Sequence, residues 1–144
     1  MKMLVMEDEY VSRSVLMEIL SPYGQVEPAE NGKEAMEKFQ KALENSERYD
    51  IVFLDIMVPE ISGQDVLKNI RALEQQHNEN DDAFITTKIV MTTALGDFTS
   101  VKTAFKQQCE AYLIKPLDRD KVLNTLQGLG LIGGTERSVI IDDE

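Results

Sequence analysis

Four short apolar runs, each ended by a polar side chain, constrain the fold of this chain more than any other feature. They occupy residues 3–6, 51–54, 89–91 and 112–114, and stretches with helical periodicity lie between them. Short apolar runs that alternate with helical patterns are typical of parallel strands that are buried on both faces. We therefore expect an α/β domain built on a parallel sheet.

A weaker fifth run completes the predicted sheet. Residues 26–29 contain Pro28, which has no amide hydrogen to donate and therefore suits an edge strand. Five strands alternating with five helices predict a doubly wound five-stranded parallel sheet of the flavodoxin-like (βα)5 type, with strand order 2-1-3-4-5. This order leaves the weak strand at one edge and brings the ends of the other four strands side by side.

The helices are predicted from their caps and their apolar positions. Asn31 and Asp118 are expected to cap the second and fifth helices, Glu34 to complete a capping box, and the third helix to begin near Gly63. Residues 74–82 are polar and are expected to form a connection. The positions expected to face inward are Val11, Val15, Leu16, Ile19, Leu20; Ala35, Met36, Phe39, Leu43; Val66, Leu67, Ile70, Leu73; Phe98, Val101, Ala104, Phe105; and Val122, Leu123, Leu126, Leu129.

Length, charge and composition narrow the classes of function. The chain has 144 residues, enough for one domain, which we place at residues 1–132, with residues 133–144 as a C-terminal tail whose order the sequence does not predict. Its formal net charge of -11 argues against direct binding to nucleic acid or to anionic membranes. We find no signal peptide, no run near the about 20 apolar residues of a membrane span, and one cysteine, so we expect a cytoplasmic protein.

The polar residues at the strand ends form one predicted site. Glu7 and Asp8 follow the first strand, Asp55 the third, Thr93 the fourth and Lys115 the fifth. Ligands of open parallel sheets bind at the carboxyl ends of the strands. Three carboxylates and one ammonium leave about two negative charges, which a divalent cation such as Mg²⁺ would neutralise. An ionised Asp55 beside Mg²⁺ is positioned as a nucleophile toward a phosphoryl group, whose oxygens Thr93 and Lys115 can contact.

Each of these residues also has an ordinary structural interpretation. Glu7 and Asp8 can be acids favoured by a helix dipole, and Asp55 can cap a turn. Thr93 can be a plain strand-end residue and Lys115 a solvated lysine. Their joint occurrence at four strand ends favours the chemical interpretation, because burying an unpaired carboxylate is costly.

The same four strand endings occur together in a known family. They are the pair Glu7-Asp8, residues 54–63, the Thr93-Ala94 step and residues 112–116. At these motifs the chain resembles the receiver domain of bacterial two-component response regulators (CheY-like) over residues 2–130. Each motif alone is weak evidence, but four in the same order are strong evidence.

The resemblance implies a phosphoacceptor and a metal site. Asp55 would accept a phosphoryl group from the phosphohistidine of a sensor histidine kinase or of a phosphotransfer protein. Mg²⁺ would be held by Glu7, Asp8, Asp55 and the backbone carbonyl of Met57, partly through water. Many members of the family have Asp where this chain has Glu7, a departure that leaves metal binding in place.

The resemblance also implies a switch. Thr93 would move toward the phosphoryl group, and Tyr112 would turn inward into the vacated space. The surface of the fourth helix, the fifth strand and the fifth helix would change with them, because an added charge biases a two-state element. The Lys115–Pro116 peptide bond would be cis, an isomer that is accessible to X-Pro bonds.

The leading prediction is a phosphorylation-dependent signalling switch, not an enzyme beyond assisting its own Mg²⁺-dependent phosphorylation and dephosphorylation. Met57 and Leu95 offer no polar group to orient an attacking water, so we expect slow dephosphorylation. We expect a monomer or weak homodimer whose output lies in a separate downstream protein, unless the chain was cut from a longer regulator.

Three other functions remain open at this stage. A carrier in a phosphorelay is equally compatible with the site residues. A phosphatase of the haloacid dehalogenase type is disfavoured, because that family has a second aspartate where this chain has Met57. A binding module that works without phosphorylation is disfavoured by the complete set of acid, hydroxyl and lysine.

Overall fold

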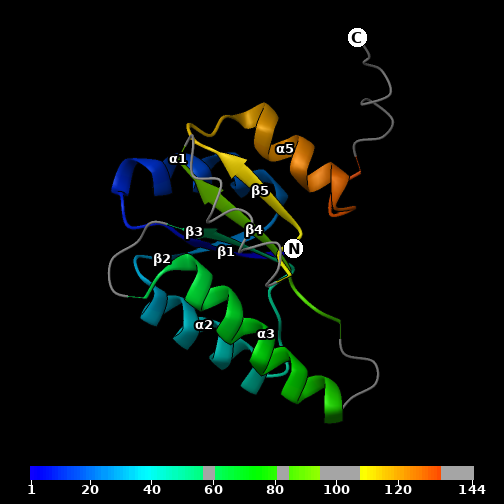
Figure 1. The fold of residues 1–144 in the computed structure, drawn as a ribbon. Coiled ribbons are helices and arrows are strands. Elements are labelled where there is room, and N and C mark those ends of the chain that lie inside the picture. Colours follow the sequence, from blue (N-terminus) through cyan, green and yellow to red (C-terminus); the bar gives the residue numbers. More distant parts are fainter. Residues whose placement is uncertain (57–60, 81–84, 95–107, 134–144) are drawn as a thin grey trace.

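Alternating strands and helices build a layered α/β domain in the computed structural model, which describes residues 1–56, 61–80, 85–94 and 108–133 (Figure 1). The elements are β1 (Lys2–Met6), α1 (Tyr10–Leu20), the 3-10 helix η1 (Ser21–Tyr23), β2 (Gln25–Ala29), α2 (Gly32–Glu44), β3 (Ile51–Asp55), α3 (Gly63–Asn80), β4 (Lys88–Thr93), β5 (Ala111–Ile114) and α5 (Arg119–Gly128). All strand pairs are parallel, in the order β2-β1-β3-β4-β5. The predicted fold class and strand order are confirmed.

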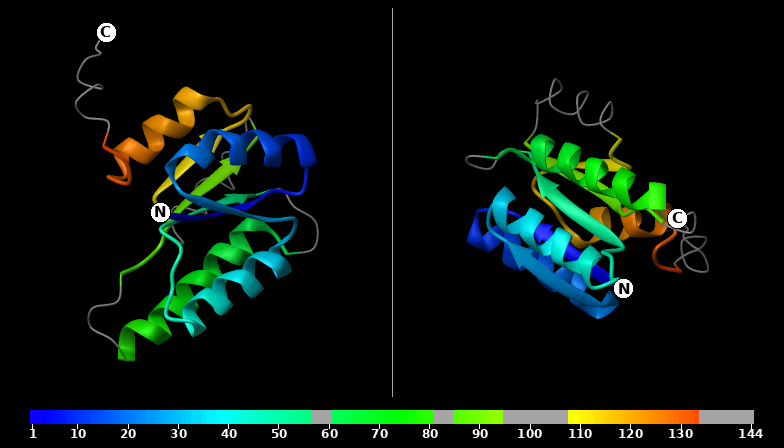
Figure 2. Two further views of the ribbon diagram at one scale, coloured as in Figure 1. Left: turned by 180° about the vertical axis from the view of Figure 1, so that it is seen from behind. Right: turned by 90° about the horizontal axis from the view of Figure 1, so that it is seen from below.

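Helices cover both faces of the sheet, α1 and α5 on one side and α2 and α3 on the other (Figure 2). Successive side chains of a strand point to opposite faces. Met3 and Val5 of β1 accordingly pack in the cluster that includes α1 and α5, and Leu4 and Met6 pack in the cluster of α2 and α3. Because both faces are covered, the central strands are apolar throughout rather than alternating.

The buried face of α1 is narrower than predicted. Leu16, Ile19 and Leu20 are buried, but Val11 is 62% exposed and Val15 is 41% exposed. At 3.6 residues per turn, these five positions spread over about half of the helix circumference, and the sheet covers only the part centred on Leu16. The prediction that Val11 and Val15 face inward is therefore wrong.

Helix α3 is longer than predicted. The polar stretch from residue 74, expected to be a connection, continues the helix as far as Asn80. Glu74 is only 2% exposed, and its carboxylate accepts hydrogen bonds from Arg71 at 2.6 Å and from the Thr87 amide at 2.6 Å. These tertiary contacts stabilise the helix although its sequence is polar here. The connection between α3 and β4 is therefore shorter than predicted.

Two predicted helix caps are present. The Asn31 side chain accepts a hydrogen bond from the Glu34 amide, and the Asp118 side chain accepts one from the Lys121 amide, both at 2.8 Å. The return bond of Glu34 goes to the Glu30 amide, one residue before the position that a capping box predicts.

Other predictions lie outside the described residues. They concern the fourth helix with Phe98, Val101, Ala104 and Phe105, and the tail beyond residue 133. Among the helices that are described, none is long and apolar enough to cross a membrane.

Candidate functional site

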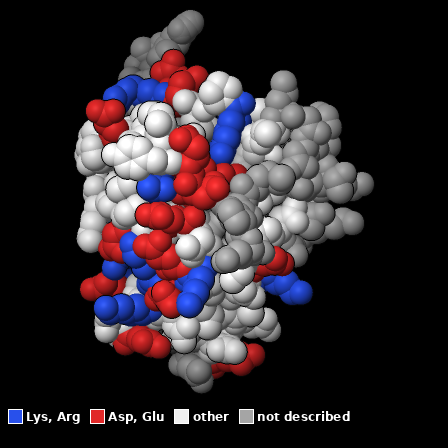
Figure 3. Space-filling view, turned by 90° about the vertical axis from the view of Figure 1, so that its left-hand side faces the viewer, with Lys and Arg blue, Asp and Glu red and all other residues white. Residues whose placement is uncertain are grey.

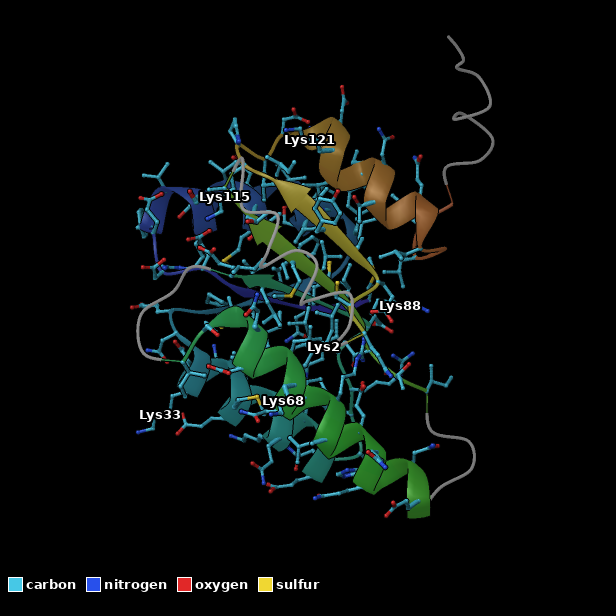
Figure 4. The ribbon with its side chains drawn as sticks, in the orientation of Figure 1. Lys2, Lys33, Lys68, Lys88, Lys115 and Lys121 are labelled. Carbon is cyan, nitrogen blue, oxygen red and sulfur yellow. The ribbon has the colours of Figure 1, made fainter. Side chains whose placement is uncertain are left out.

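Four strands deliver their polar end residues to one edge of the sheet, which we call the carboxyl edge. In the parallel register Asp55 lies beside Thr92, and Thr93 lies beside Ile114. The Lys115 amide then donates to the Thr93 carbonyl at 2.8 Å, which fixes the end of β5 against β4. Figure 4 shows Lys115 at this edge, and Lys2 and Lys88 at the opposite edge, where the strands begin.

A buried ion-pair cluster lies at the carboxyl edge. Nζ of Lys115 is 2.7 Å from Oε1 of Glu7 and 2.9 Å from Oδ2 of Asp55. Both carboxylates are almost fully buried, with exposed fractions of 5% for Glu7 and 3% for Asp55. Asp8 is exposed at the rim, and one oxygen from each of the three acids lies within 4.8 Å of the others. This arrangement fits a divalent cation bound by oxygen ligands.

The pKa values of the cluster reflect burial and charge crowding. Burial raises the pKa of Glu7. The hydrogen bond from Lys115 lowers this pKa and the neighbouring Asp55 raises it, and the net result is a raised pKa. Burial lowers the pKa of Lys115, but the hydrogen bonds to Glu7 and Asp55 outweigh that effect and raise it overall. Lys115 therefore remains a cation at neutral pH, within a cluster that has an excess of negative charge.

The loop after β1 is held by hydrogen bonds on both sides of the acidic pair. Oε2 of Glu7 accepts a hydrogen bond from the Glu9 amide at 3.2 Å. Glu9 is the N-cap of α1, and its carboxylate accepts from the amides of Ser12 at 2.8 Å and Val11 at 3.1 Å. The bonds from Ser12, followed by the bond from Val11, lower the pKa of Glu9. The cap thus fixes where the helix begins relative to the site.

Gly63 allows α3 to begin against the backbone of Asp55. A Cβ atom at position 63 would lie 2.3 Å from the Asp55 carbonyl oxygen, far inside van der Waals contact. The Gly63 amide donates to the Ile56 carbonyl at 3.4 Å. Only glycine permits this close approach without a shift of the strand end that carries Asp55.

The residues of the implied switch occupy neighbouring strands. Thr93 is 1% exposed, and its hydroxyl donates to the Ala94 carbonyl at 3.3 Å. Tyr112 on β5 is 40% exposed, and it lies beside Met91 of β4 in the parallel register. The Lys115–Pro116 peptide bond is cis, the isomer that the family resemblance implies. Met57, whose carbonyl the family resemblance places among the metal ligands, lies outside the described residues.

The face that carries the site is acidic. Figure 3 looks onto this face, and red acidic side chains form a band across its middle. Asp8, Glu9 and Glu30 are exposed in the loops that follow β1 and β2. Any anionic ligand approaching this face meets a negative field, which a bound cation would reduce.

Sequence reasoning missed one residue beside the site, Arg13. Its guanidinium donates to the carbonyl oxygen of Glu7 at 2.8 Å and lies 3.9 Å from the carboxylate of Glu30. The available signal was modest: Arg13 is the only basic residue of a helix that begins at the acidic pair. Its contact with the Glu7 backbone depends on how α1 folds back and is not visible in the residue pattern.

Comparison with known proteins identifies the family. The pattern of the response regulator receiver domain family matches residues 3–127. The chain belongs to this receiver domain family. It is 33% identical over 122 residues to the transcriptional regulatory protein CrdR of Helicobacter pylori, covering 84% of this chain and 51% of CrdR. The receiver domain thus spans about half the length of that relative.

Two further relatives match over nearly their whole length. The chemotaxis protein CheY of Listeria monocytogenes is 30% identical over 129 residues, which cover 88% of this receiver domain and 96% of CheY. The solved structure of the response regulator TrrA from Thermotoga maritima, in complex with Mg(2+)-BeF, superposes with a TM-score of 0.68 at 31% identity. That match covers 89% of this chain and 97% of TrrA.

Proposed function

We propose that this receiver domain is a phosphorylation-dependent signalling switch in which Asp55 accepts a phosphoryl group. The observation that carries the proposal is the buried Asp55 carboxylate, hydrogen-bonded to Lys115 at 2.9 Å and grouped with two further acids within 4.8 Å. The donor is the phosphohistidine of a sensor histidine kinase or of a phosphotransfer protein. Membership of the receiver domain family supports this assignment.

Glu7, Asp8 and Asp55 are the residues that would hold Mg²⁺, with the backbone carbonyl of Met57 as a further ligand by family resemblance. The oxygen donors and the net negative charge of the cluster fit a hard divalent cation. When bound, Mg²⁺ supplies positive charge that offsets the negative charges of the acids and of the incoming phosphoryl group.

The transfer itself needs few parts. A carboxylate oxygen of Asp55 attacks phosphorus, the bond between phosphorus and the donor's histidine nitrogen breaks, and the electron pair leaves with the imidazole. Lys115, already 2.9 Å from Asp55, donates to a phosphoryl oxygen. This role is positioning and charge stabilisation, the usual requirement of phosphoryl transfer.

Phosphorylation then changes the conformations of Thr93 and Tyr112. The Thr93 hydroxyl exchanges the Ala94 carbonyl for a phosphoryl oxygen, a stronger acceptor because it is charged. Tyr112, 40% exposed in this structure, turns inward. The surface of β5 and α5 changes with them and binds a downstream protein.

An apolar surface next to the site supports a protein as the donor. Tyr10, Val11 and Val15 of α1 are 70%, 62% and 41% exposed. A hollow of about 450 Å³ lies between Val11, Val15 and the loop of Lys115 and Leu117. Exposed apolar side chains that gather beside a hollow are typical of sites where another protein binds.

The test is the mass of the intact chain after incubation with Mg²⁺ and acetyl phosphate. We expect the native chain to gain one phosphoryl group and Asp55→Asn to gain none. Asp118→Asn is a matched control, because asparagine also caps a helix well and Asp118 caps α5 outside the cluster. This control is expected to gain the group as the native chain does.

An equal gain by the native chain and by Asp55→Asn would refute Asp55 as the acceptor. No gain by the native chain, either from acetyl phosphate or from a phosphorylated kinase, would refute the switch. A phosphorelay carrier uses the same chemistry at Asp55, and it is distinguished by onward transfer of the group to a phosphotransfer protein.

A further inference from the structure

Arg13 connects three parts of the carboxyl edge from one position in α1. Its side chain is 12% exposed and lies over the ring of Tyr10, with Cζ 5.6 Å from the ring centre. Nη1 of Arg13 donates to the Glu7 carbonyl at 2.8 Å, and Nη2 lies 3.9 Å from the Glu30 carboxylate. Arg13 therefore links α1, the loop after β1 and the loop after β2.

The carbonyl that Arg13 contacts belongs to the peptide unit between Glu7 and Asp8. The amide of Glu7, on the other side of the same residue, donates to the Ala29 carbonyl at 3.0 Å. The Glu7 backbone is thus held by β2 through its N–H and by Arg13 through its C=O. The two rotatable bonds that flank this planar unit are ψ of Glu7 and φ of Asp8, and a change in either one that the other does not offset turns the two acids relative to each other.

We infer that Arg13 is a positioning residue for the metal site: its hydrogen bond to the Glu7 carbonyl fixes the acidic pair in the orientation that brings both carboxylates to Asp55. This inference rests on the proposed function, since it takes Glu7, Asp8 and Asp55 as the residues that hold Mg²⁺. Mutation of a residue that orients a metal ligand typically weakens metal binding about 10- to 100-fold.

The charge of Arg13 has the opposite effect from its hydrogen bond. A guanidinium close to the acidic pair repels Mg²⁺, so removing the charge alone would tighten Mg²⁺ binding. Losing the hydrogen bond frees the peptide unit and weakens binding. The sign of the change in affinity therefore separates positioning from simple electrostatics.

The experiment is a titration of the full chain with Mg²⁺. NMR chemical shifts of the backbone amides near the site report the binding at each Mg²⁺ concentration. Arg13→Met removes the donor and the charge but keeps the apolar stem, and we expect its Kd for Mg²⁺ to rise about tenfold. Arg13→Lys keeps the charge and one donor, and we expect a rise of about threefold or less.

Arg48→Met is the matched control. Arg48 likewise donates to a backbone carbonyl, that of Tyr49, and pairs with a carboxylate, that of Asp50 at 3.3 Å, but it precedes β3 at the opposite edge. We expect this variant to bind Mg²⁺ as the native chain does. Thermal unfolding of each variant shows whether it is folded at the temperature of the titration.

An unchanged or lower Kd for Arg13→Met would overturn the inference and leave the metal site intact. Absence of Mg²⁺ binding by the native chain would instead refute the proposed metal site, and the inference with it. If Arg13→Met does not fold, Arg13→Gln decides, because it too removes the charge and is too short to keep the bond to the Glu7 carbonyl: a weaker affinity than that of the native chain supports positioning, and an equal or tighter affinity overturns it.

Discussion

Both edges of the sheet hold a cluster of buried charges, and the two clusters differ in how the negative charges are satisfied. At the carboxyl edge, Lys115 contacts Glu7 and Asp55, and Asp8 adds a third acid. At the opposite edge, which we call the amino edge, Arg71 of α3 contacts Glu74 and Glu110. Each cluster has one cation and more than one acid.

At the amino edge, hydrogen bonds from the protein itself satisfy the cluster. All three guanidinium nitrogens of Arg71 donate, and the acceptors include the backbone carbonyls of Thr87 and Gln108. The carboxylates of Glu74 and Glu110 also accept from the amides of Thr87 and Ile89, both at 2.6 Å. Such a network fixes α3 against the segments that lead into β4 and β5.

The acids of the carboxyl edge are crowded around a single ammonium, and burial, together with the neighbouring Asp55, raises the pKa of Glu7. The comparison teaches that burial alone does not distinguish a structural charge cluster from a functional one. The two clusters differ in charge balance: one cation meets two acids at the amino edge and three at the carboxyl edge, so the carboxyl edge is the better suited to binding a cation. Removing one negative charge should therefore have opposite effects on stability at the two edges.

The largest effect is expected at the amino edge, from Glu74→Gln. The substitution breaks the 2.6 Å ion pair with Arg71 at a site that is 2% exposed, and we expect the free energy of unfolding to fall by about 3 kcal/mol. Urea unfolding at pH 7 measures the change. The control Glu44→Gln, at an exposed position of α2, should change stability by less than about 0.5 kcal/mol. A loss below about 1 kcal/mol for Glu74→Gln would contradict the description of this cluster as structural.

Gly63→Ala is expected to have the next largest effect. The added Cβ would lie 2.3 Å from the Asp55 carbonyl, so the start of α3 or the end of β3 must shift, at a cost of about 2 kcal/mol. Because the shift moves Asp55, the rate of phosphorylation by acetyl phosphate should fall as well. At Gly128 a Cβ would meet nothing within 4 Å, and alanine there should leave both properties unchanged or add up to about 1 kcal/mol of stability. Equal behaviour of the two variants would show that close packing at Gly63 does not position Asp55.

The sequence predicted most of the site because strand ends are encoded locally. Parallel strands must all end at the same edge, so Asp55, Thr93 and Lys115 were brought together by a rule of topology rather than by any contact visible in the sequence. The sheet order followed in the same way, with Pro28 marking the edge strand.

What the sequence did not predict depends on contacts between distant segments. Arg71 meets the carbonyl of Gln108 across 37 positions of the chain, and this network extends α3 through residues that looked like a polar connection. The exposure of Val11 and Val15 depends on how much of α1 the sheet covers. Hydrophobic periodicity carries no information of either kind.

Glu7→Gln tests the carboxyl edge. We expect it to change the free energy of unfolding by less than Gly63→Ala does, and to raise it, whereas Glu74→Gln lowers it. The pKa of Glu7 is raised above 4.5, so protonated Glu7 stabilises the fold below that pH, and this contribution is lost as pH rises through the raised pKa. Glutamine imitates the protonated side chain. Without Mg²⁺, the variant should therefore match the native chain near pH 4 and become the more stable of the two by pH 7.

Urea unfolding across this pH range, repeated with Mg²⁺, measures both parts of the Glu7 prediction. Mg²⁺ should stabilise the native chain more than the variant, because a ligand stabilises the state that binds it. If Glu7→Gln lowered stability at pH 7 as Glu74→Gln is expected to do, the difference in sign between the two edges would be refuted.

The smallest expected effect is a gain in stability from Gln108→Gly at the amino edge. Gln108 has a φ of 73°, in the left-handed region that a side chain disfavours, while its carbonyl is held by Arg71 at 2.8 Å. Glycine relieves the strain and keeps the backbone carbonyl, for a net gain of about 0.5 kcal/mol. Gln75→Gly, within the regular helix α3, should instead lose about 1 kcal/mol.

Differential scanning calorimetry of both glycine variants, with phosphorylation of Asp55 measured in parallel, completes the comparison of the two edges. The strained backbone of Gln108 places its carbonyl for Arg71 and does not contact Asp55. Its relief should therefore leave the phosphorylation rate unchanged. Relief of crowding by Glu7→Gln should weaken Mg²⁺ binding, because the charge that destabilises the fold is one of those that would hold the cation. A gain at Gln108 that also slowed phosphorylation would mean that the amino edge acts on the site, and that the two clusters are coupled through β4 and β5.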